Sequence, residues 1–339
     1  MTDIADQAGA AGVAQSGPGA PAQRSHDRSS TSGRPPRSTE VLARSSRARL
    51  RLVNAGARRL ATPRNDTDPL EIRNTIDRLA RLQPRPHGVV TRSAIVAGVP
   101  GEWVVAKKAT SPLTLLYFHG GGYIAGGPHT HRALVGALVR RFGGRAFVPD
   151  YRLAPEHRYP AALDDARSVY DRLILDVGPD SLVVGGDSAG GGLATALMAD
   201  RRDAGAPMPE RLALISPWVD LTGPIPEAIE SRSSTDVVMR ADQIRAAALT
   251  YAGERVAEPG ASPLWGDLSD LPPTMIQVGS AELLGVEGEL LADRLLAVGV
   301  AVRLEVWQHM AHVFQAVPVL REHRPALDRL AGFLLTPTG

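Results

Sequence analysis

The sequence predicts an α/β protein in which a mostly parallel sheet carries helices on both faces. The first observation is a regular alternation of short apolar runs with longer helical patterns along the chain. The second is that several runs are unbroken blocks of Val, Leu and Ile, which is typical of strands buried on both faces. The third is size: 339 residues, 43% of them hydrophobic, can bury an ample core without disulfides or a structural metal.

Eight apolar runs are expected to form the strands, because each is short and apolar and is set apart from the helical patterns. The first two follow one another without a helix between them, so the sheet is expected to begin with an antiparallel pair. The expected strands are 88–96, 102–107, 113–118, 145–149, 181–184, 211–215, 274–278 and 302–307. The expected helices among them are 130–142, 160–175, 191–204, 283–297 and 321–335.

Residues 1–38 are expected to be a disordered basic tail, because they are rich in Ala, Gly, Ser, Pro and Arg and nearly lack large apolar side chains. Residues 1–64 hold eleven arginines against four acidic residues, a net charge of +7, whereas the whole chain carries only +2. The basic character therefore belongs to the N-terminal segment. We interpret it as a solvated tail, with recruitment to an anionic membrane or to nucleic acid as the alternative.

Residues 39–84 are expected to form N-terminal cap helices that pack over the sheet. One helical pattern covers 40–60, and a second covers 70–82 with Asp66 or Asp68 as its N-cap.

Residues 85–339 are expected to form the catalytic domain. Within it, the stretch 220–260 breaks the alternation, since it holds one helical pattern near 240–251 and no evident strand. We therefore interpret 220–260 as a cap insertion above the sheet.

The composition excludes several classes of protein. The chain has no cysteine, which excludes disulfide scaffolds, cysteine nucleophiles, Fe–S clusters and thiolate zinc sites. No run approaches the roughly 20 apolar residues of a membrane-spanning helix, and the first residues lack the apolar segment of a secretory signal. A cytoplasmic protein without a metal or cofactor is the expectation.

Ser188 is the candidate nucleophile. It stands in Gly186-Asp187-Ser188-Ala189-Gly190, between the apolar run 181–184 and a helical pattern. That strand–turn–helix setting is the one a nucleophile elbow needs, because the flanking glycines allow a sharp turn with the hydroxyl exposed at its tip. The alternative is a tight glycine-rich turn in which Ser188 only caps the helix.

Three consecutive glycines, Gly120, Gly121 and Gly122, follow the apolar run 113–118. Their unobstructed backbone N–H groups are candidate donors to an oxyanion, as acyl transfer requires. His119 precedes them and is expected to shape the loop. The alternatives are a flexible loop or a phosphate cradle, but the Rossmann and P-loop spacings are absent, which argues against nucleotide binding.

A serine hydroxyl needs a base, normally histidine, oriented by an acid. His312 and His309 lie in the loop after the strand 302–307, and a histidine late in the chain matches the order Ser, acid, His of hydrolase triads. We favour His312. The remaining histidines are interpreted as structural or solvated: His26, His87, His129, His131, His157 and His323.

Glu282 is the candidate acid, because it lies in the loop directly after the strand 274–278 and no aspartate occurs there before Asp293. Glutamate can replace aspartate in this role, since what matters is the orientation of the imidazole. Glu287 is the second candidate. For both, the alternative is an ordinary acid in the first turn of a helix.

The chain resembles the bacterial hormone-sensitive-lipase-like esterases of the α/β-hydrolase superfamily. The resemblance spans about residues 85–335. Four blocks carry it: 119–123, 150–157 with 159–165, 186–191, and 307–315. Lesser matches lie at 215–218 and 270–273.

The resemblance implies an α/β-hydrolase fold with an eight-stranded sheet, an N-terminal helical cap and Ser–acid–His catalysis. It implies oxyanion donors at Gly121, Gly122 and Ala189, with His119 and Asp187 in supporting positions. The family often places aspartate where this chain has Glu282.

The expected activity is hydrolysis of short-chain carboxylic esters by Ser188, Glu282 and His312. The expected partner is a small acyl ester. No nucleic acid and no integral membrane association are expected, and the sequence does not decide whether the chain forms a homodimer. The same residues could serve a lactone or N-acetyl hydrolase. A non-catalytic ligand-binding receptor is a further alternative, although such relatives usually lose a triad residue.

Overall fold

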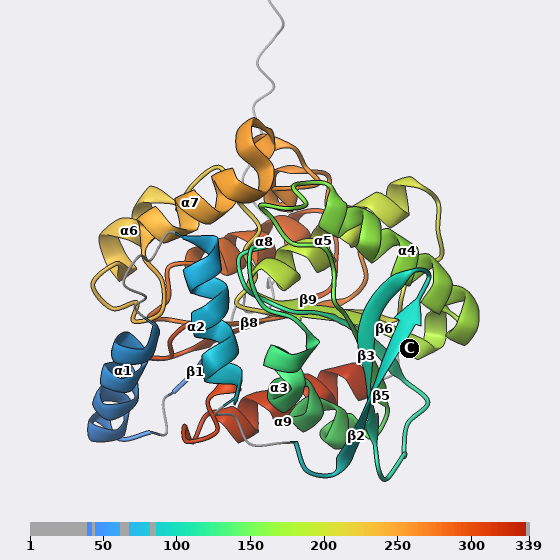
Figure 1. Ribbon diagram of the computed structural model, residues 1–339, viewed down its shortest axis with the longest axis horizontal. Coiled ribbons are helices and arrows are strands. Elements are labelled where there is room, and N and C mark those ends of the chain that lie inside the picture. The colour runs from blue at the N-terminus through green and yellow to red at the C-terminus, as the bar shows by residue number, and fades with distance from the viewer. Residues whose placement is uncertain (1–38, 43–44, 62–67, 82–85, 337–339) are drawn as a thin grey trace, which may run out of the picture. The chain divides into compact units, whose positions relative to one another are not determined.

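The computed structural model describes residues 39–42, 45–61, 68–81 and 86–336 (Figure 1). The predicted tail 1–38 lies outside them. Within the described residues nine strands form one sheet, and in chain order they are β1 (Thr39–Val41), β2 (Val89–Val96), β3 (Val99–Ala106), β4 (Thr114–Phe118), β5 (Arg145–Pro149), β6 (Leu182–Asp187), β7 (Arg211–Ile215), β8 (Thr274–Gly279) and β9 (Val302–Trp307).

The strands lie side by side in the order β1-β9-β8-β7-β6-β4-β5-β3-β2. Strand β2 pairs antiparallel with β3, and β3 pairs antiparallel with β5. All other neighbours are parallel. The predicted α/β fold, with its antiparallel start and mostly parallel sheet, is confirmed, but over the described ranges the sheet has nine strands instead of the expected eight, because β1 adds to its edge beside β9.

Helices connect the strands and cover both faces of the sheet (Figure 1). The helices are α1 (Arg47–Ala61), α2 (Pro69–Arg81), α3 (Pro128–Phe142), α4 (Ala161–Val177), α5 (Ala189–Asp203), α6 (Pro226–Arg232), α7 (Ala241–Ala252), α8 (Gly285–Ala297) and α9 (His323–Leu335). Short 3-10 turns occupy Pro179–Ser181, Gly253–Ala257, Pro263–Trp265 and Phe314–Ala316.

The core lies in two layers, one on each face of the sheet. Because side chains alternate along a strand, Leu115 and Tyr117 of β4 join α3 and α9 in one layer, while Leu116 and Phe118 join α4, α5 and α8 in the other. This two-sided burial explains the unbroken apolar runs of the central strands.

Two expectations at the periphery were wrong. The pattern 40–60 was expected to be one helix, but it starts with strand β1 and its helix begins only at Arg47. Strand β1 pairs with β9, and the Gln308 N–H donates to the Val41 carbonyl at 2.9 Å. Residues 39–41 form a strand because the edge of β9, far along the chain, offers free hydrogen-bonding groups. Helical periodicity within 40–60 cannot reveal that pairing.

The stretch 220–260 holds two helices, α6 and α7, where we expected one. Helix α7 packs close to the predicted oxyanion loop, since the ring of Tyr251 stacks on Tyr123 at 3.9 Å between ring centres. Helix α2 is capped by Asp68, whose carboxylate accepts from the N–H of Leu70 at 2.9 Å.

Candidate functional site

The predicted site residues lie at the carboxyl ends of four parallel strands. Gly120 follows β4, Ser188 follows β6, Glu282 follows β8 and His312 follows β9. Parallel strands all end at the same edge of their sheet, and ligands bind there in open α/β sheets. The topology therefore gathers residues that are up to 192 positions apart in the sequence at one edge.

Ser188 occupies a strained turn between β6 and α5. Its backbone has φ 53° and ψ −125°, a conformation that L-residues rarely adopt. The turn is held because the Ser188 N–H donates to the Ile215 carbonyl at 2.9 Å and the Ser188 carbonyl accepts from Trp218 at 2.9 Å. The side chain is thereby presented at the start of a helix, where the dipole favours developing negative charge.

Gly190 shows why this turn requires glycine. A Cβ atom at this position would lie 2.1 Å from the Phe118 carbonyl oxygen, so the helix could not approach β4 with a larger residue. This close approach of helix and strand places Ser188 beside the glycine loop that follows β4.

Glu282 and His312 form a buried pair. The Nδ1 atom of His312 lies 2.7 Å from Oε2 of Glu282, whose carboxylate is fully buried. The other carboxylate oxygen accepts from the Gly279 N–H at 2.7 Å and from the Ser216 hydroxyl at 2.9 Å. A proton on Nδ1 leaves Nε2 of the neutral imidazole as the acceptor.

The pKa of His312 is raised above its usual value. Burial acts to lower this pKa, but the hydrogen bond and charge of Glu282 outweigh it, and the charges of Asp236 and Asp187 add to the increase. The surroundings of His312 therefore stabilise the positively charged form of its imidazole.

Glycine at position 279 lets the two loops that carry this pair approach each other. A Cβ atom there would lie 2.1 Å from the Met310 carbonyl oxygen. Two backbone bonds join the loops, from Ala281 to Met310 at 3.1 Å and from Ser280 to Trp307 at 2.9 Å.

The second candidates, Glu287 and His309, lie elsewhere. The Glu287 carboxylate is buried and accepts from the N–H groups of Val219 and Asp220, both at 3.0 Å. Burial raises its pKa well above the usual value. His309 is exposed, and its backbone N–H donates to the Ser280 hydroxyl at 2.8 Å.

Three N–H groups are available at the predicted oxyanion site. Within the described residues, no hydrogen bond uses the N–H of Gly121 or Gly122, and Ala189 is the first residue of α5, whose N–H has no helical acceptor. All three therefore remain free to donate to a ligand.

Gly120 does not fit the expected role as a donor. Its N–H points at a buried pair, 3.3 Å from Oδ1 of Asp187 and 3.2 Å from Nε2 of His131. We correct the prediction for Gly120, which connects the loop to the elbow instead of presenting a free N–H.

Asp187 links the nucleophile elbow to the oxyanion loop. Its carboxylate accepts from the Tyr117 hydroxyl at 2.8 Å and lies 3.3 Å from His131 Nε2. Burial acts to raise the pKa of Asp187, but the charge and hydrogen bond of His131 outweigh it and lower that pKa. The sequence reasoning missed His131, because only the fold places it beside Asp187.

His119 contacts the glycine loop that follows it. Its buried Nδ1 donates to the Gly120 carbonyl at 2.8 Å, and its ring stacks on Tyr151 at 4.1 Å. The Tyr151 hydroxyl donates to the His119 carbonyl at 2.7 Å. Burial, with help from the charge of His131, lowers the pKa of His119 to about 3, so the ring is neutral.

Ser216 and Asp236 support the acid loop and were also missed. The buried Ser216 hydroxyl donates to Glu282 and accepts from the Val313 N–H at 3.2 Å, so it bridges the acid and the segment after His312. Asp236 accepts from the Leu283 N–H at 2.8 Å. A lone serine or aspartate carries no sequence signal for a contact with a residue so distant in the chain.

Ser188 and His312 line one cavity of about 390 Å³. Among the described residues no hydrogen bond joins the Ser188 hydroxyl to the imidazole; such bonds often tighten only when substrate binds. The cavity wall is mainly apolar and includes residues from α2, α3 and α7: Ile72, Ile76, Leu79, Leu134, Ile244 and Ala247.

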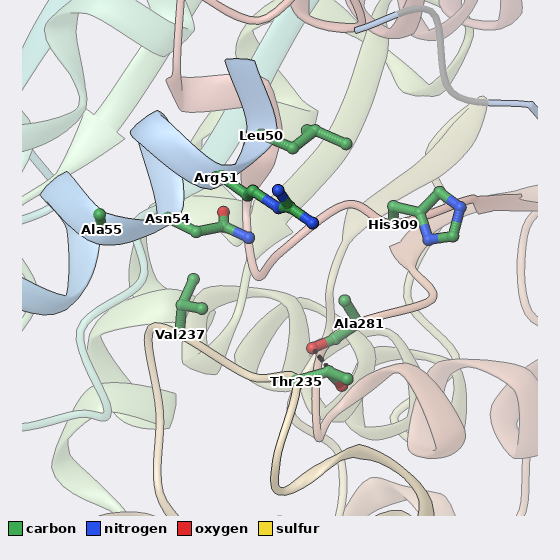
Figure 2. Close-up of a pocket in the computed structure, with 8 residues that line it drawn as sticks. All are labelled: Leu50, Arg51, Asn54, Ala55, Thr235, Val237, Ala281 and His309. Carbon is green, nitrogen blue, oxygen red and sulfur yellow. Dashed lines mark hydrogen bonds between the residues drawn. The ribbon is translucent and has the colours of Figure 1, made fainter. Parts of the chain in front are cut away.

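A second cavity of about 500 Å³ lies beside α1 (Figure 2). It is bordered by Arg51, Thr235, Ala281 and His309, and the Thr235 hydroxyl donates to the Ala281 carbonyl at 3.4 Å. Of the described residues that line it, none is Ser188 or His312, so His309 belongs to a different cavity from the candidate nucleophile.

No helix in the described ranges has the length and apolar character needed to cross a lipid bilayer. Over the same ranges, His, Asp and Glu side chains do not gather in any group of three or more that could hold a metal ion.

Known proteins resemble this chain over most of its length. Residues 115–316 match the family described as alpha/beta hydrolase fold. An acetyl-hydrolase of Streptomyces hygroscopicus is 40% identical over 257 residues, which is 75% of this chain and 84% of the relative. An esterase of Acinetobacter venetianus is 34% identical, over 78% of this chain and 88% of the relative.

A solved structure shares the fold closely. The crystal structure of an esterase from the bacterial hormone-sensitive lipase family superposes with a TM-score of 0.81 at 35% identity, covering 87% of this chain and all of that one.

Proposed function

From the premise that this chain belongs to the alpha/beta hydrolase fold family, among the esterases of the bacterial hormone-sensitive lipase group, we propose a specific reaction. The chain hydrolyses short-chain carboxylic esters with Ser188, Glu282 and His312. The observation that carries the proposal is that a serine with a strained backbone and a buried His–Glu pair line one cavity. The triad logic of nucleophile, base and orienting acid accounts for each residue.

In the proposed reaction the Ser188 oxygen attacks the acyl carbon while His312 Nε2 takes the hydroxyl proton. The tetrahedral intermediate collapses, the bond to the alcohol oxygen breaks, and His312 returns its proton to the leaving alcohol. A water molecule then attacks the acyl-enzyme with the same histidine as base, which releases the carboxylic acid and restores Ser188. Glu282 holds the imidazole and stabilises its positive charge.

The N–H groups of Gly121, Gly122 and Ala189 are the proposed donors to the oxyanion. They come from the loop after β4 and from the start of α5. One preorganised donor of this kind lowers the barrier by about 3 kcal/mol. Asp187 and His119 keep the loop in place without touching the reacting atoms.

The size of the cavity supports a small substrate. Its volume of about 390 Å³ is the space available to the ester beside Ser188 and His312. Its apolar wall suits an acyl chain, since the free energy gained on burial is roughly proportional to the apolar area removed from water. The relative named acetyl-hydrolase supports the same size class.

We expect turnover of p-nitrophenyl esters to peak between acetate and hexanoate and to fall steeply toward palmitate, because longer chains exceed the cavity. The measurement is kcat/KM over the acyl series on the wild-type chain. A profile that rises toward palmitate would contradict the short-chain proposal. A protein that reacts with a fluorophosphonate at Ser188 but turns over no ester would instead indicate a lactone or N-acetyl hydrolase.

Glu282→Gln should lower kcat by about ten-thousandfold, because an amide cannot stabilise the imidazolium and favours the wrong tautomer. The acid limb of the pH–rate profile tests the same contact. The base works only when neutral, so the raised pKa of His312 places the wild-type midpoint at higher pH than a free imidazole would give. Removing the Glu282 charge takes away the main cause that opposes burial and leaves only the charges of Asp236 and Asp187 against it, so the midpoint should move to lower pH.

Glu287→Gln is the matched control for that substitution. Burial raises the pKa of Glu287, so its carboxyl favours the neutral form that glutamine imitates, and the amide oxygen can still accept from Val219 and Asp220. The rate should stay within a few-fold of wild type. The reverse ranking of the two variants would move the acid to Glu287.

A further inference from the structure

Arg73 joins helix α2 to the loop that carries the proposed oxyanion donors. Its guanidinium donates from Nε to the Ile124 carbonyl at 2.5 Å and from Nη2 to the Ala154 carbonyl at 2.6 Å. It also makes a two-point ion pair with Glu156, at 2.7 Å from Nη1 and 2.6 Å from Nη2. One side chain on α2 therefore contacts three residues of the two segments that follow β4 and β5.

Helix α2 forms one wall of the reaction cavity. Thr75 on α2 is buried, while Ile72, Ile76 and Leu79 are only partly buried and face the same cavity as Ser188. Because this apolar face is incompletely covered, its burial alone holds the helix less firmly than a core helix is held.

A second polar contact on the same helix is weaker. Asp77 lies 2.8 Å from Nε2 of His129, and both side chains are more than two-fifths exposed. Solvent screens such a pair, which typically contributes little. The Arg73 side chain, in contrast, is 23% exposed and donates to two backbone carbonyls as well as to a carboxylate.

We propose that Arg73 is a positioning residue that fixes α2 as the cavity wall, and that it thereby determines which acyl chains fit. The inference deepens the proposed function and rests on it, since it names the contact that sets the acyl limit. The geometry requires arginine: a planar fork with five donors reaches carbonyls and carboxylate together, whereas lysine is a point charge.

The oxyanion loop retains its own support when Arg73 is removed. The N–H groups of Ile124 and Ala125 both donate to the Gly121 carbonyl, at 3.2 and 3.0 Å. Loss of Arg73 should therefore loosen α2 more than it disturbs the donors. The kinetic signature is a change in KM and in acyl preference, with a smaller change in kcat.

The test compares Arg73→Ala with Arg78→Ala, an exposed arginine on the same helix. Arg73→Ala should raise KM for p-nitrophenyl butyrate by about tenfold, because only part of the population keeps the wall closed. The ratio of kcat/KM for decanoate to that for butyrate should rise by a similar factor. Hydrogen exchange across 69–81 should become faster, and Arg73→Lys should lie between Arg73→Ala and wild type.

Glu156→Gln provides a second variant, because this residue is half exposed and glutamine keeps its size and shape. Its effects on KM and acyl preference should be similar to those of Arg73→Ala but smaller. The double variant, Arg73→Ala with Glu156→Gln, should show a smaller effect than the two single effects added together, as expected for residues in direct contact. Exchange rates and acyl preference of Arg73→Ala that equal those of Arg78→Ala would overturn the inference. Failure of the wild type to turn over any ester would instead refute the proposed function.

Discussion

Replacing Ser188 with alanine should lower kcat for ester hydrolysis by about a millionfold, the loss seen when a triad nucleophile is removed. Alanine lacks the hydroxyl that forms the acyl-enzyme, and no other group in the proposed mechanism can replace it. In the proposed mechanism His312 acts on Ser188, so His312 and Glu282 have no catalytic role once the hydroxyl is gone. The measurement is p-nitrophenyl butyrate turnover by wild type and variant at matched concentrations.

The fold should tolerate this substitution. Alanine retains the Cβ atom, so the backbone strain at φ 53° stays as it is, and the turn keeps its bonds to Ile215 and Trp218. Circular dichroism and thermal unfolding should therefore match wild type. A folded variant that retains more than a few per cent of the activity would show that Ser188 is not the nucleophile.

His312→Ala should be nearly as damaging, again by about a millionfold, because the serine loses its general base. The structure offers a matched control in the same loop. His309 borders the second cavity and is exposed (Figure 2), so His309→Ala should stay within a few-fold of wild type. Both rates are measured with the same ester.

The pair of histidine variants distinguishes chemistry from damage to the loop. His309 lies three residues before His312 and has a left-handed backbone with φ 63°, so its replacement tests how sensitive activity is to a change in this loop. If both variants lost activity equally, the loss would report the loop and our assignment of the base would be wrong.

The contrast between Ser188 and His131 shows how far sequence reasoning could reach. Ser188 lies in a five-residue pattern whose meaning depends only on the strand before it and the helix after it. His131 lies in the first turn of α3 and contacts Asp187, 56 residues away. The local sequence pattern identifies Ser188 but carries no information on His131, because the contact between His131 and Asp187 depends on how α3 packs against the sheet.

Glu282 and Gly120 lie between a residue that local sequence identifies and one that it does not. Glu282 was predicted because chain order and strand ends place an acid near a late histidine, and the structure puts its carboxylate 2.7 Å from His312. Gly120 is predicted as a donor because it begins a run of three glycines at a strand end, but its N–H is engaged with Asp187 and His131. Counting glycines cannot show which N–H is already engaged.

By itself the sequence determined the alternation of strands and helices, the family, and the residues at the ends of the parallel strands. Each of these depends on side-chain periodicity or on a short motif, which are local properties. Only the tertiary structure decided the pairing of β1 with β9, the bridge made by Ser216, the support from Asp236 and the contacts of Arg73. These contacts join residues far apart in the chain, so their partners are set by packing and not by spacing.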